Sequence, residues 1–292
     1  MNPKKITPAE IAEAMKMTDR QIWSFARKLD AFFKPTRVQR IGSKEREIDA
    51  PIDTAKKKLK LLHRWFSSKK MFHTAAHGGI KGRSCFSSAH QHLGKKFVWT
   101  RDAKDCYPSI TPEMFFRELK NIGFRHDTAT LLTRICTLRG RVPQGSPVSN
   151  DAVNLYFWCI DQLIRSSGGT KRVSYSRVAD DFVLSGNKRS EGEALVRRLE
   201  SELQQRHIRI NKKKREKSGF QINQKLVHNI RVENRRGTKI SEEHWKIILD
   251  LAKSYQIACK RVQPSTLEAV AWKRQQLNGY LNYSKQADLT KT

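Results

Sequence analysis

The chain has 292 residues, of which 38% are hydrophobic and 29% are charged, as expected of a folded protein with one or two domains. Its 58 Lys and Arg residues against 28 Asp and Glu residues give a net charge of +30, which makes nucleic acid the expected partner. No stretch approaches the ~20 apolar residues of a membrane span, and the N-terminus lacks the apolar core of a secretory signal.

In the first third of the chain, helical and extended segments alternate. A helix is expected to begin at residue 7, because Thr-Pro-Ala-Glu supplies a capping hydroxyl followed by a proline in the first turn. Residues 37–51 are expected to be extended, with a turn at residues 42–43. Residues 53–67 place apolar side chains on one helical face and lysines on the other. The glycine-rich residues 75–84 are expected to form a loop that lets the backbone approach a phosphate.

The rest of the chain contains the longest helical patterns. An apolar strand is expected to end near Asp102, residues 174–186 to form a β-hairpin, and residues 207–217 to form a basic strand and turn. Helices are expected at residues 111–123, 151–166, 190–206, 240–258 and 265–286. Strands alternating with helices, followed by a helical tail, predict an α+β fold with one domain in residues 1–235 and a helical domain in residues 236–292.

The five cysteines are scattered and odd in number, and no two of them have CxxC spacing. This usage predicts neither a zinc site nor a disulfide framework, and it favours a reducing cytoplasm. The nine histidines form no recognisable ligand set, so they are interpreted as structural residues.

Three carboxylates are the candidate centre of the chemistry. Asp102 ends an apolar strand, and Asp180 and Asp181 lie at the tip of the expected hairpin 78 residues later. If the two strands are neighbours, the carboxylates meet, and oxygen ligands of this kind suit Mg²⁺ shared with substrate phosphates. Two such ions can activate an attacking hydroxyl and stabilise a leaving pyrophosphate. The Asp pair taken alone is more typical of solvated acids in a turn.

Neighbouring motifs favour the metal site. The segments FVWTRDAKDCYPSIT, RVPQGSPVSN and YSRVADDFVLSG occur in this order, and their spacing resembles that of the palm motifs of reverse transcriptases. RVQRIGSKEREIDAP resembles the fingers segment of that family, INKKK its later lysine motif and LNGYLNYSK its thumb helix. The resemblance covers roughly residues 35–285. It implies a right-hand polymerase, with fingers and palm in residues 1–235 and a helical thumb in residues 236–292.

The resemblance also implies roles for single residues. The metal ligands for two Mg²⁺ ions would be Asp102, Asp180, Asp181 and the backbone of Ala103, although alternation along a strand points Asp181 away from Asp180. Residues matching the family's nucleotide contacts are Arg46, Tyr107, Gln144, Gly145 and Lys214. An aromatic ring such as that of Tyr107 would clash with a 2′-hydroxyl and select deoxynucleotides, whereas viral RNA polymerases usually carry an aspartate there. A core aromatic is the alternative reading of this tyrosine.

Among reverse transcriptases, the sequence most resembles the bacterial retron enzymes. Their YTR segment is nearly kept as Tyr175-Ser176-Arg177. Three departures stand out: SAxxH at residues 88–92 in place of NAxxH, VADD in place of YADD, and Val-His-Asn at residues 227–229 in place of VTG. The VTG segment is tied in retrons to recognition of the cognate RNA.

The expected function is therefore RNA-directed DNA synthesis. A retron-type enzyme would bind a structured non-coding RNA and an RNA–DNA hybrid, use deoxynucleoside triphosphates, make single-stranded DNA and serve antiphage defence with a separate effector protein. Three alternatives remain open. They are another defence-associated bacterial reverse transcriptase with a different product or priming mode, an inactive polymerase-shaped RNA-binding protein, and an RNA polymerase.

Overall fold

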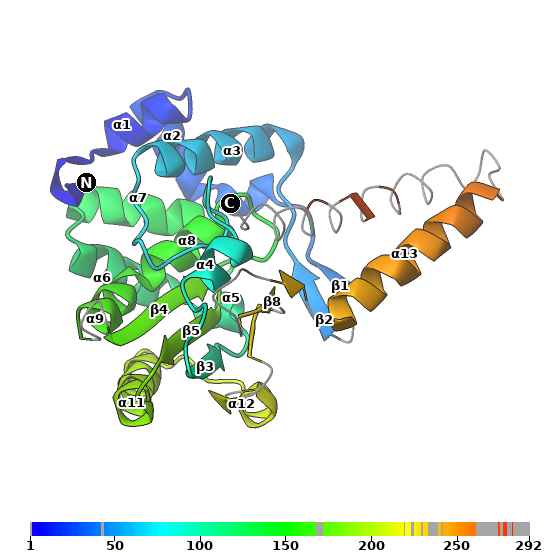
Figure 1. The fold of residues 1–292 in the computed structure, drawn as a ribbon. Coiled ribbons are helices and arrows are strands. Elements are labelled where there is room, and N and C mark those ends of the chain that lie inside the picture. The colour runs from blue at the N-terminus through cyan, green and yellow to red at the C-terminus, as the bar shows by residue number, and fades with distance from the viewer. Residues whose placement is uncertain are drawn as a thin grey trace.

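The structure is a computed structural model that describes residues 2–41, 44–167, 172–218, 220–222, 225–228, 230–232, 239–240 and 242–260, with isolated positions at 274, 277, 278 and 282. Figure 1 shows the arrangement of the elements. The elements up to the first long strand are η1 (Pro3–Lys5), α1 (Pro8–Ala14), α2 (Asp19–Arg27), η2 (Leu29–Phe32), β1 (Arg37–Ile41), β2 (Lys44–Ile48), α3 (Asp53–Ser68), α4 (Cys85–His90) and β3 (Phe97–Asp102). The middle elements are α5 (Cys106–Ser109), α6 (Pro112–Ile122), α7 (His126–Cys136), α8 (Ser149–Tyr156), α9 (Trp158–Ser167), β4 (Val173–Val178) and β5 (Asp181–Gly186). The last are α11 (Arg189–Gln205), α12 (Lys212–Ser218), β6 (Phe220–Gln221), β7 (Leu226–Val227), β8 (Ile230–Arg231), β9 (Lys239–Ile240) and α13 (Glu242–Lys260).

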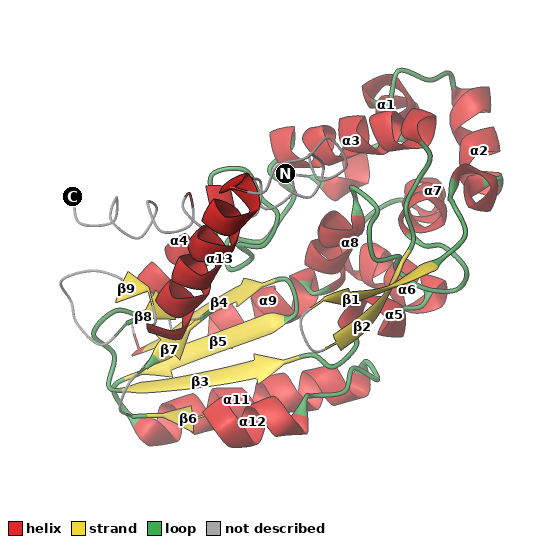
Figure 2. Ribbon diagram, turned by 90° about the vertical axis from the view of Figure 1, so that its right-hand side faces the viewer, coloured by secondary structure: helices red, strands yellow, loops and turns green. Residues whose placement is uncertain are grey.

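An antiparallel sheet in the order β4-β5-β3-β6 forms the centre of the molecule (Figure 2). The predicted hairpin is β4–β5, and β5 also pairs with β3 along its whole length, from Phe97 opposite Gly186 to Asp102 opposite Asp181. Helices α9 and α11 contact one face of this sheet, where Trp99 lies in the larger apolar core. Helix α4 and strands β7 and β8 contact each other over the other face, where Val98 lies in a smaller apolar cluster.

Several helices form where the sequence signals predict them. In α3, Leu59, Leu62 and Phe66 are fully buried, and the lysines lie on the exposed face. Helix α6 begins after Thr111, whose side chain accepts a hydrogen bond from the third residue of the helix, and it ends at Gly123 in the left-handed conformation. The expected extended segments before α3 form the β1–β2 hairpin, whose predicted turn lies outside the described residues.

Three parts of the chain differ from the prediction. Helix α7 was not predicted, and the helix expected at residues 151–166 is two helices, α8 and α9, separated at Phe157. The prediction of a strand and turn at residues 207–217 is wrong in its second half, because α12 begins at Lys212. The side chain of Asn211 accepts a hydrogen bond from the backbone N–H of Lys214, which caps a run of good helix formers.

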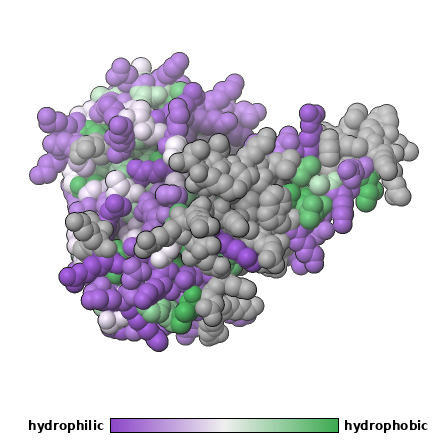
Figure 3. All heavy atoms as spheres, viewed as in Figure 1, coloured by the Kyte–Doolittle hydropathy of each residue, from purple (hydrophilic) through white to green (hydrophobic). Residues whose placement is uncertain are grey.

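Helix α13 projects away from the sheet and confirms the first of the two C-terminal helices (Figure 1). The second, at residues 265–286, lies almost entirely outside the described residues, so the division of the chain at residue 235 stays a prediction. Hydrophilic residues dominate the face shown in Figure 3, whereas exposed apolar residues lie on α13, among them Leu249 and Ile257. In the described part of the chain, no helix is both long and apolar enough to cross a membrane.

Candidate active site

The three predicted carboxylates meet at one end of the central sheet. Asp102 is the last residue of β3 and lies opposite Asp181, the first residue of β5. Asp180 lies in the turn before β5, and its carbonyl accepts a hydrogen bond of 3.0 Å from the backbone N–H of Ala103. Residues 78 positions apart are therefore fixed side by side by strand pairing, as the sequence led us to expect.

The turn between β4 and β5 is held from behind by a buried arginine. Arg177 is 0% exposed, and its guanidinium donates to the carbonyl of Ala179 at 2.7 Å, to Asn154 Oδ1 at 3.1 Å and to both carboxylate oxygens of Asp161 at 3.0 and 2.6 Å. Ala179 adopts a left-handed conformation with φ of 51°, so its carbonyl direction depends on this support. A Cβ on Gly78 would lie 2.6 Å from the backbone nitrogen of Ala179, so only glycine allows this loop to pack behind the turn.

A cavity of 440 Å³, here called the main cavity, opens above the carboxylates. Its walls come from β2, the end of β3, α5, the segment before α8 and the β4–β5 turn. Its lining includes six of the residues predicted from the sequence: Arg46, Asp102, Ala103, Tyr107, Gln144 and Asp180. The main cavity thus gathers metal-binding and nucleotide-binding candidates from distant parts of the chain.

Three predicted residues lie elsewhere, namely Gly145 and the pair Asp181 and Lys214. Asp181 and Lys214 line a second cavity of 270 Å³, which shares only Asp102 with the main cavity among the described lining residues. Lys214 Nζ lies 2.5 Å from Asp102 Oδ2 and 3.5 Å from Asp181 Oδ1. Lys214 therefore partly neutralises these two carboxylates from the second cavity, and its expected role as a nucleotide contact stays a prediction.

The electrostatics of the carboxylates differ. Burial acts to raise the pKa of Asp102, but hydrogen bonds from Lys214 and Asn211 hold that pKa below its usual value. Burial raises the pKa of Asp180, and repulsion from the Asp102 charge raises it further. Burial and the neighbouring carboxylates also raise the pKa of Asp181, against the attraction of Lys214. The surroundings of Asp102 thus favour its charged form, whereas Asp180 and Asp181 are the members whose charged forms a nearby cation would favour.

This donor set fits a divalent cation in part. Asp102, Asp180 and Ala103 line the main cavity and carry oxygen groups of the kind that Mg²⁺ requires, and the repulsion between the two carboxylates is what a cation would remove. Within the described residues, no three His, Cys, Asp or Glu side chains are arranged as a ready-made metal site. Asp181 and its Lys214 partner face the second cavity instead, in line with the alternation expected along the strand.

The loop that contains Pro-Gln-Gly is joined to the β1–β2 hairpin. The backbone N–H of Asp49, just after β2, donates to the carbonyl of Gln144 at 2.7 Å. Gly145 has φ of 116°, and a Cβ there would lie 3.0 Å from the Asp49 carbonyl, so glycine is needed for the approach of loop and hairpin. Gly145 lines an adjoining groove of 480 Å³ rather than the main cavity, together with Arg46 and Gln144.

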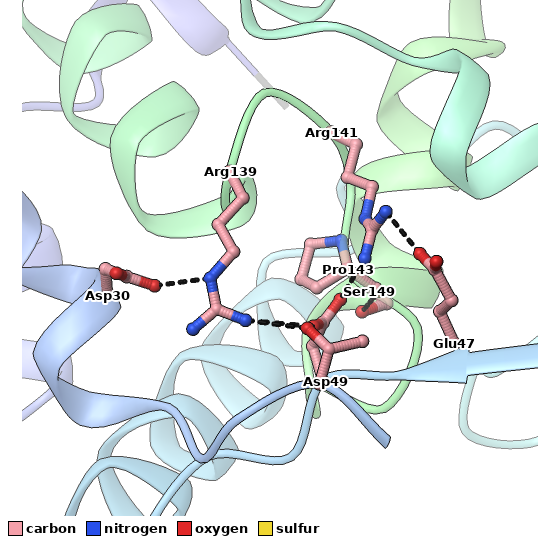
Figure 4. A network of polar contacts seen from close by, with 8 residues as sticks. Asp30, Glu47, Asp49, Arg139, Arg141, Pro143 and Ser149 are labelled. Atoms are coloured by element: carbon pink, nitrogen blue, oxygen red, sulfur yellow. Dashed lines mark hydrogen bonds and ion pairs between the residues drawn. The ribbon is translucent and has the colours of Figure 1, made fainter. Parts of the chain in front are cut away.

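Two arginines of the same loop bracket Asp49, which is 1% exposed (Figure 4). Arg139 Nη1 lies 3.5 Å from Asp49 Oδ1, and its Nε lies 2.7 Å from Asp30 Oδ1. Arg141 Nη2 lies 3.2 Å from Asp49 Oδ2, and its Nη1 lies 2.5 Å from Glu47 Oε2. These ion pairs fix the hairpin against the loop. Neither arginine is among the site residues predicted from the sequence.

Tyr107 stands between the main cavity and the adjoining groove and lines both. It lies in the short helix α5, which follows Asp105 in a left-handed conformation, and its hydroxyl donates to Asn150 Oδ1. Burial, aided by the negative charge of Asp180, raises the pKa of Tyr107, so the hydroxyl is neutral and donates. The ring is half-buried and faces the cavity beside the carboxylates, rather than lying wholly in the core.

Behind the sheet, two of the departures from the retron pattern touch each other. Ser88 Oγ lies 3.1 Å from His228 Nε2, and it also lies 2.7 Å from Ser176 Oγ. Ser176 in turn contacts His92 Nε2 at 2.7 Å, while His92 Nδ1 lies 2.7 Å from Ser185 Oγ. Burial lowers the pKa of both histidines, so their rings are neutral hydrogen-bonding groups, as the structural interpretation of the histidines implied. Ser88 is shorter than the Asn of the retron pattern, and His228 is longer than the Thr of that pattern. The two changes together allow the hydrogen bond between positions 88 and 228.

This fold and site define a right-hand polymerase of the α+β class, in which a sheet presents acidic residues from a β-hairpin and from the neighbouring strand. A family model described as "Reverse transcriptase (RNA-dependent DNA polymerase)" matches residues 44–224, which is more than half of the chain. The chain therefore belongs to the reverse transcriptase family.

Retron enzymes are among the curated proteins that it resembles. It is 32% identical over 108 residues to the retron Ec86 reverse transcriptase of Escherichia coli, covering 37% of this chain and 34% of that protein. It is 31% identical over 191 residues to the retron Mx162 reverse transcriptase of Myxococcus xanthus, covering 57% of this chain and 38% of that protein. The match thus spans just over a third of the length of these relatives. The predicted retron-like identity is confirmed at this level.

Solved structures confirm the fold. A structure of telomerase from Candida tropicalis in complex with a TWJ fragment of telomeric RNA aligns with a TM-score of 0.53 and 11% identity, covering 94% of this chain and 58% of that one. A structure of telomerase from Candida albicans, also with a TWJ fragment of telomeric RNA, aligns with a TM-score of 0.50 and 13% identity, covering 92% and 60%. At these identities the likeness concerns the fold alone.

Proposed function

We propose that the protein is an RNA-directed DNA polymerase that extends a primer with deoxynucleoside triphosphates on an RNA template. The observation that carries this proposal is the main cavity, in which two carboxylates, a basic side chain, an aromatic ring and an amide meet from five separate segments. Membership of the reverse transcriptase family supports the same reaction. The net charge of +30 supports a nucleic-acid substrate.

In this proposal, Asp102 and Asp180 hold two Mg²⁺ ions together with the backbone of Ala103, and Asp181 contributes from the second cavity. When bound, these ions supply activation of the primer hydroxyl and neutralisation of the leaving pyrophosphate. Lys214 keeps Asp102 ionised through its 2.5 Å contact, so that this carboxylate is ready to bind a cation.

Other residues position the nucleotide. Arg46 offsets the charge of the triphosphate at the wall of the main cavity, and Gln144 contacts the incoming nucleotide. The ring of Tyr107, tethered through its hydroxyl to Asn150, lies where a 2′-hydroxyl would meet it, which selects deoxynucleotides. Gly145 keeps the loop close to the β1–β2 hairpin, which maintains the distance between Arg46 and Gln144.

We further propose a retron-type role. The enzyme would bind a dedicated structured RNA and prime from a 2′-hydroxyl within it. It would then make RNA-linked single-stranded DNA in the cytoplasm for antiphage defence, together with an effector protein. The similarity to retron reverse transcriptases and the basic character of the chain support this role. Residues 236–292 would act as the thumb that holds the RNA–DNA hybrid.

A primer-extension assay tests the polymerase proposal. The purified protein should extend a DNA primer on an RNA template with deoxynucleotides and Mg²⁺, and ribonucleotides should be poor substrates. Absence of extension on any template, together with retained RNA binding, would favour the inactive RNA-binding alternative. Efficient use of ribonucleotides that Tyr107→Ala does not improve would favour an RNA polymerase.

The retron-type role has its own test. The protein is purified from its native locus, and the co-purifying nucleic acid is sequenced before and after RNase treatment. A single structured RNA carrying linked DNA is the expected result. DNA attached to protein, or synthesis without any RNA, would point to another defence-associated reverse transcriptase, and the absence of bound nucleic acid would exclude the retron-type role.

A further inference from the structure

We infer that Arg141 is a second triphosphate-binding cation of the main cavity. When the nucleotide binds, a phosphate oxygen replaces the carboxylate of Glu47 as a partner of Arg141. This inference rests on the proposed polymerase function. Among the described residues that line the main cavity, Arg46 and Arg141 are the only cations, against five acidic side chains. Lys214, the cation that sequence reasoning paired with Arg46, lines the second cavity and is engaged by Asp102 and Asp181.

A triphosphate needs more positive charge than Arg46 alone provides. Two divalent ions and Arg46 only just balance the five acidic side chains of the cavity, so a strongly anionic ligand finds no net positive charge there without a further cation. Arg141 lines the main cavity from the segment before α8, two residues after Arg139 and three before Gln144. Its side chain is 24% exposed. Its planar fork of donors can bind two phosphate oxygens at once, which a lysine cannot do.

The two ion pairs of Arg141 are unequal. Nη2 is anchored on Asp49, whose side chain is 1% exposed, whereas Nη1 is paired with Glu47, whose side chain is 57% exposed. An exposed ion pair is weak because solvent screens it, while a buried one resists disruption. The Glu47 contact is therefore the one that a phosphate oxygen can displace, with Asp49 keeping the guanidinium in place.

Displacement of Glu47 also has a consequence for the hairpin. Glu47 follows Arg46 on β2, and both line the main cavity. When Arg141 leaves Glu47 for a phosphate, the triphosphate is held between an arginine on the hairpin and one on the loop. The same ligand then links the two segments that Glu47 and Arg141 linked before.

Arg139 provides a matched control. It shares Asp49 with Arg141 and is bound by Asp30 and Thr36, but it does not line the main cavity (Figure 4). Arg139→Gln and Arg141→Gln each remove one arginine from the same buried carboxylate. Any damage to the fold through Asp49 is therefore common to both variants, and loss of a phosphate contact belongs to Arg141 alone.

The experiment measures KM for a deoxynucleoside triphosphate, kcat, and inhibition by pyrophosphate in primer extension, with unfolding curves for each variant. Arg141→Gln should raise KM about tenfold or more and weaken pyrophosphate inhibition to a similar extent, with a smaller change in kcat. Arg139→Gln should change both by less than about threefold, and Glu47→Gln should lower KM or leave it unchanged. If KM rises as much in Glu47→Gln as in Arg141→Gln, the proposed replacement of Glu47 by a phosphate oxygen on Arg141 is wrong.

Equal rises in KM for Arg139→Gln and Arg141→Gln would overturn the inference, because both rises would then result from the disturbance of Asp49. If Arg141→Gln does not fold, Arg141→Lys replaces it. This variant keeps the charge without the fork, so a rise in KM supports the inference and an unchanged KM refutes it. If the unaltered protein incorporates no deoxynucleotide, the proposed function and this inference fall together; if it does and the two arginine variants coincide, only this inference falls.

Discussion

Replacement of Arg177 by Met is the most informative change in the site. Together with a second substitution at Asp161, it distinguishes a loss of folding stability from a loss of the geometry of the β4–β5 turn. Met keeps an unbranched side chain of similar reach but removes the charge. The carboxylate of Asp161, which is 0% exposed, would then keep the hydroxyl of Tyr175 at 2.7 Å and lose its two guanidinium contacts. Breaking a buried pair from one side costs ~3–5 kcal/mol. We therefore expect urea unfolding to show a loss of that order.

The second effect of this change is on catalysis. The carbonyl of Ala179 would lose its 2.7 Å donor, in a left-handed residue directly before Asp180. In the double variant Arg177→Met/Asp161→Asn, no uncompensated charge remains, so most of the stability should return. The carbonyl still lacks its donor, so kcat in primer extension should stay at least about tenfold low while KM changes little.

A control variant and two possible results test this account of Arg177. Arg206→Met breaks the pair with Glu118, which is 2% exposed, at a place that does not contact the β4–β5 turn. It should lower stability without lowering kcat once folded. Full recovery of kcat in the double variant would refute the role of Arg177 in positioning the turn. A loss of less than ~1 kcal/mol in the single variant would refute the account of the buried pair.

Four further predictions concern other residues. Asp180→Asn should abolish DNA synthesis in primer extension and leave RNA binding in a gel-shift assay unchanged, since only a metal-holding carboxylate is lost. Gly145→Ala should lower the free energy of unfolding by ~1–3 kcal/mol, because φ is 116° and the new methyl group meets a carbonyl at 3.0 Å; unchanged urea curves would contradict this. Tyr107→Val should raise the kcat/KM ratio for ribonucleotides over deoxynucleotides about tenfold or more, and an unaltered ratio would remove the tyrosine from sugar selection. The hydrogen bond that His63 donates to Asp151, against the effect of burial, raises the pKa of His63 above 6.5, so protonated His63 stabilises the fold fully below that pH and less as the pH rises through the raised value. The stability difference between the unaltered protein and His63→Gln should accordingly shrink as the pH rises above 6.5 in urea unfolding, and a difference that grows would contradict the sign.

The core of the site was predictable because it depends on local patterns. Strand signals before Asp102 and around Asp180 fix two elements, and pairing of those elements suffices to bring the carboxylates together. Gln144 and Gly145 belong to one short loop whose composition marks it. The fold class follows for the same reason, since it needs only the order of strands and helices.

What the sequence did not reveal depends on side-chain direction across long separations. Lys214 lines the second cavity because Asn211 caps a helix at that point, and the prediction of a strand and turn there gave too little weight to the helix propensity of the lysines. Ser88 and His228 are 140 residues apart, and no periodicity links them. Arg177 did leave a signal, namely the one charged residue of its strand, which in a buried sheet requires a partner of opposite charge.

The pairing at the outer side of β4 bears on how the protein behaves at high concentration. The segment at residues 75–77 runs parallel to the C-terminal end of this edge strand, with Arg177 donating from its backbone N–H to Ala75 at 2.8 Å and accepting from His77 at 2.7 Å. At the opposite edge, β6 is two residues long. An open strand edge is a template on which a second copy can add its own strand, and a covered or very short one is not. Substitutions that dislodge residues 75–77 should therefore cause aggregation before they alter the chemistry of the site.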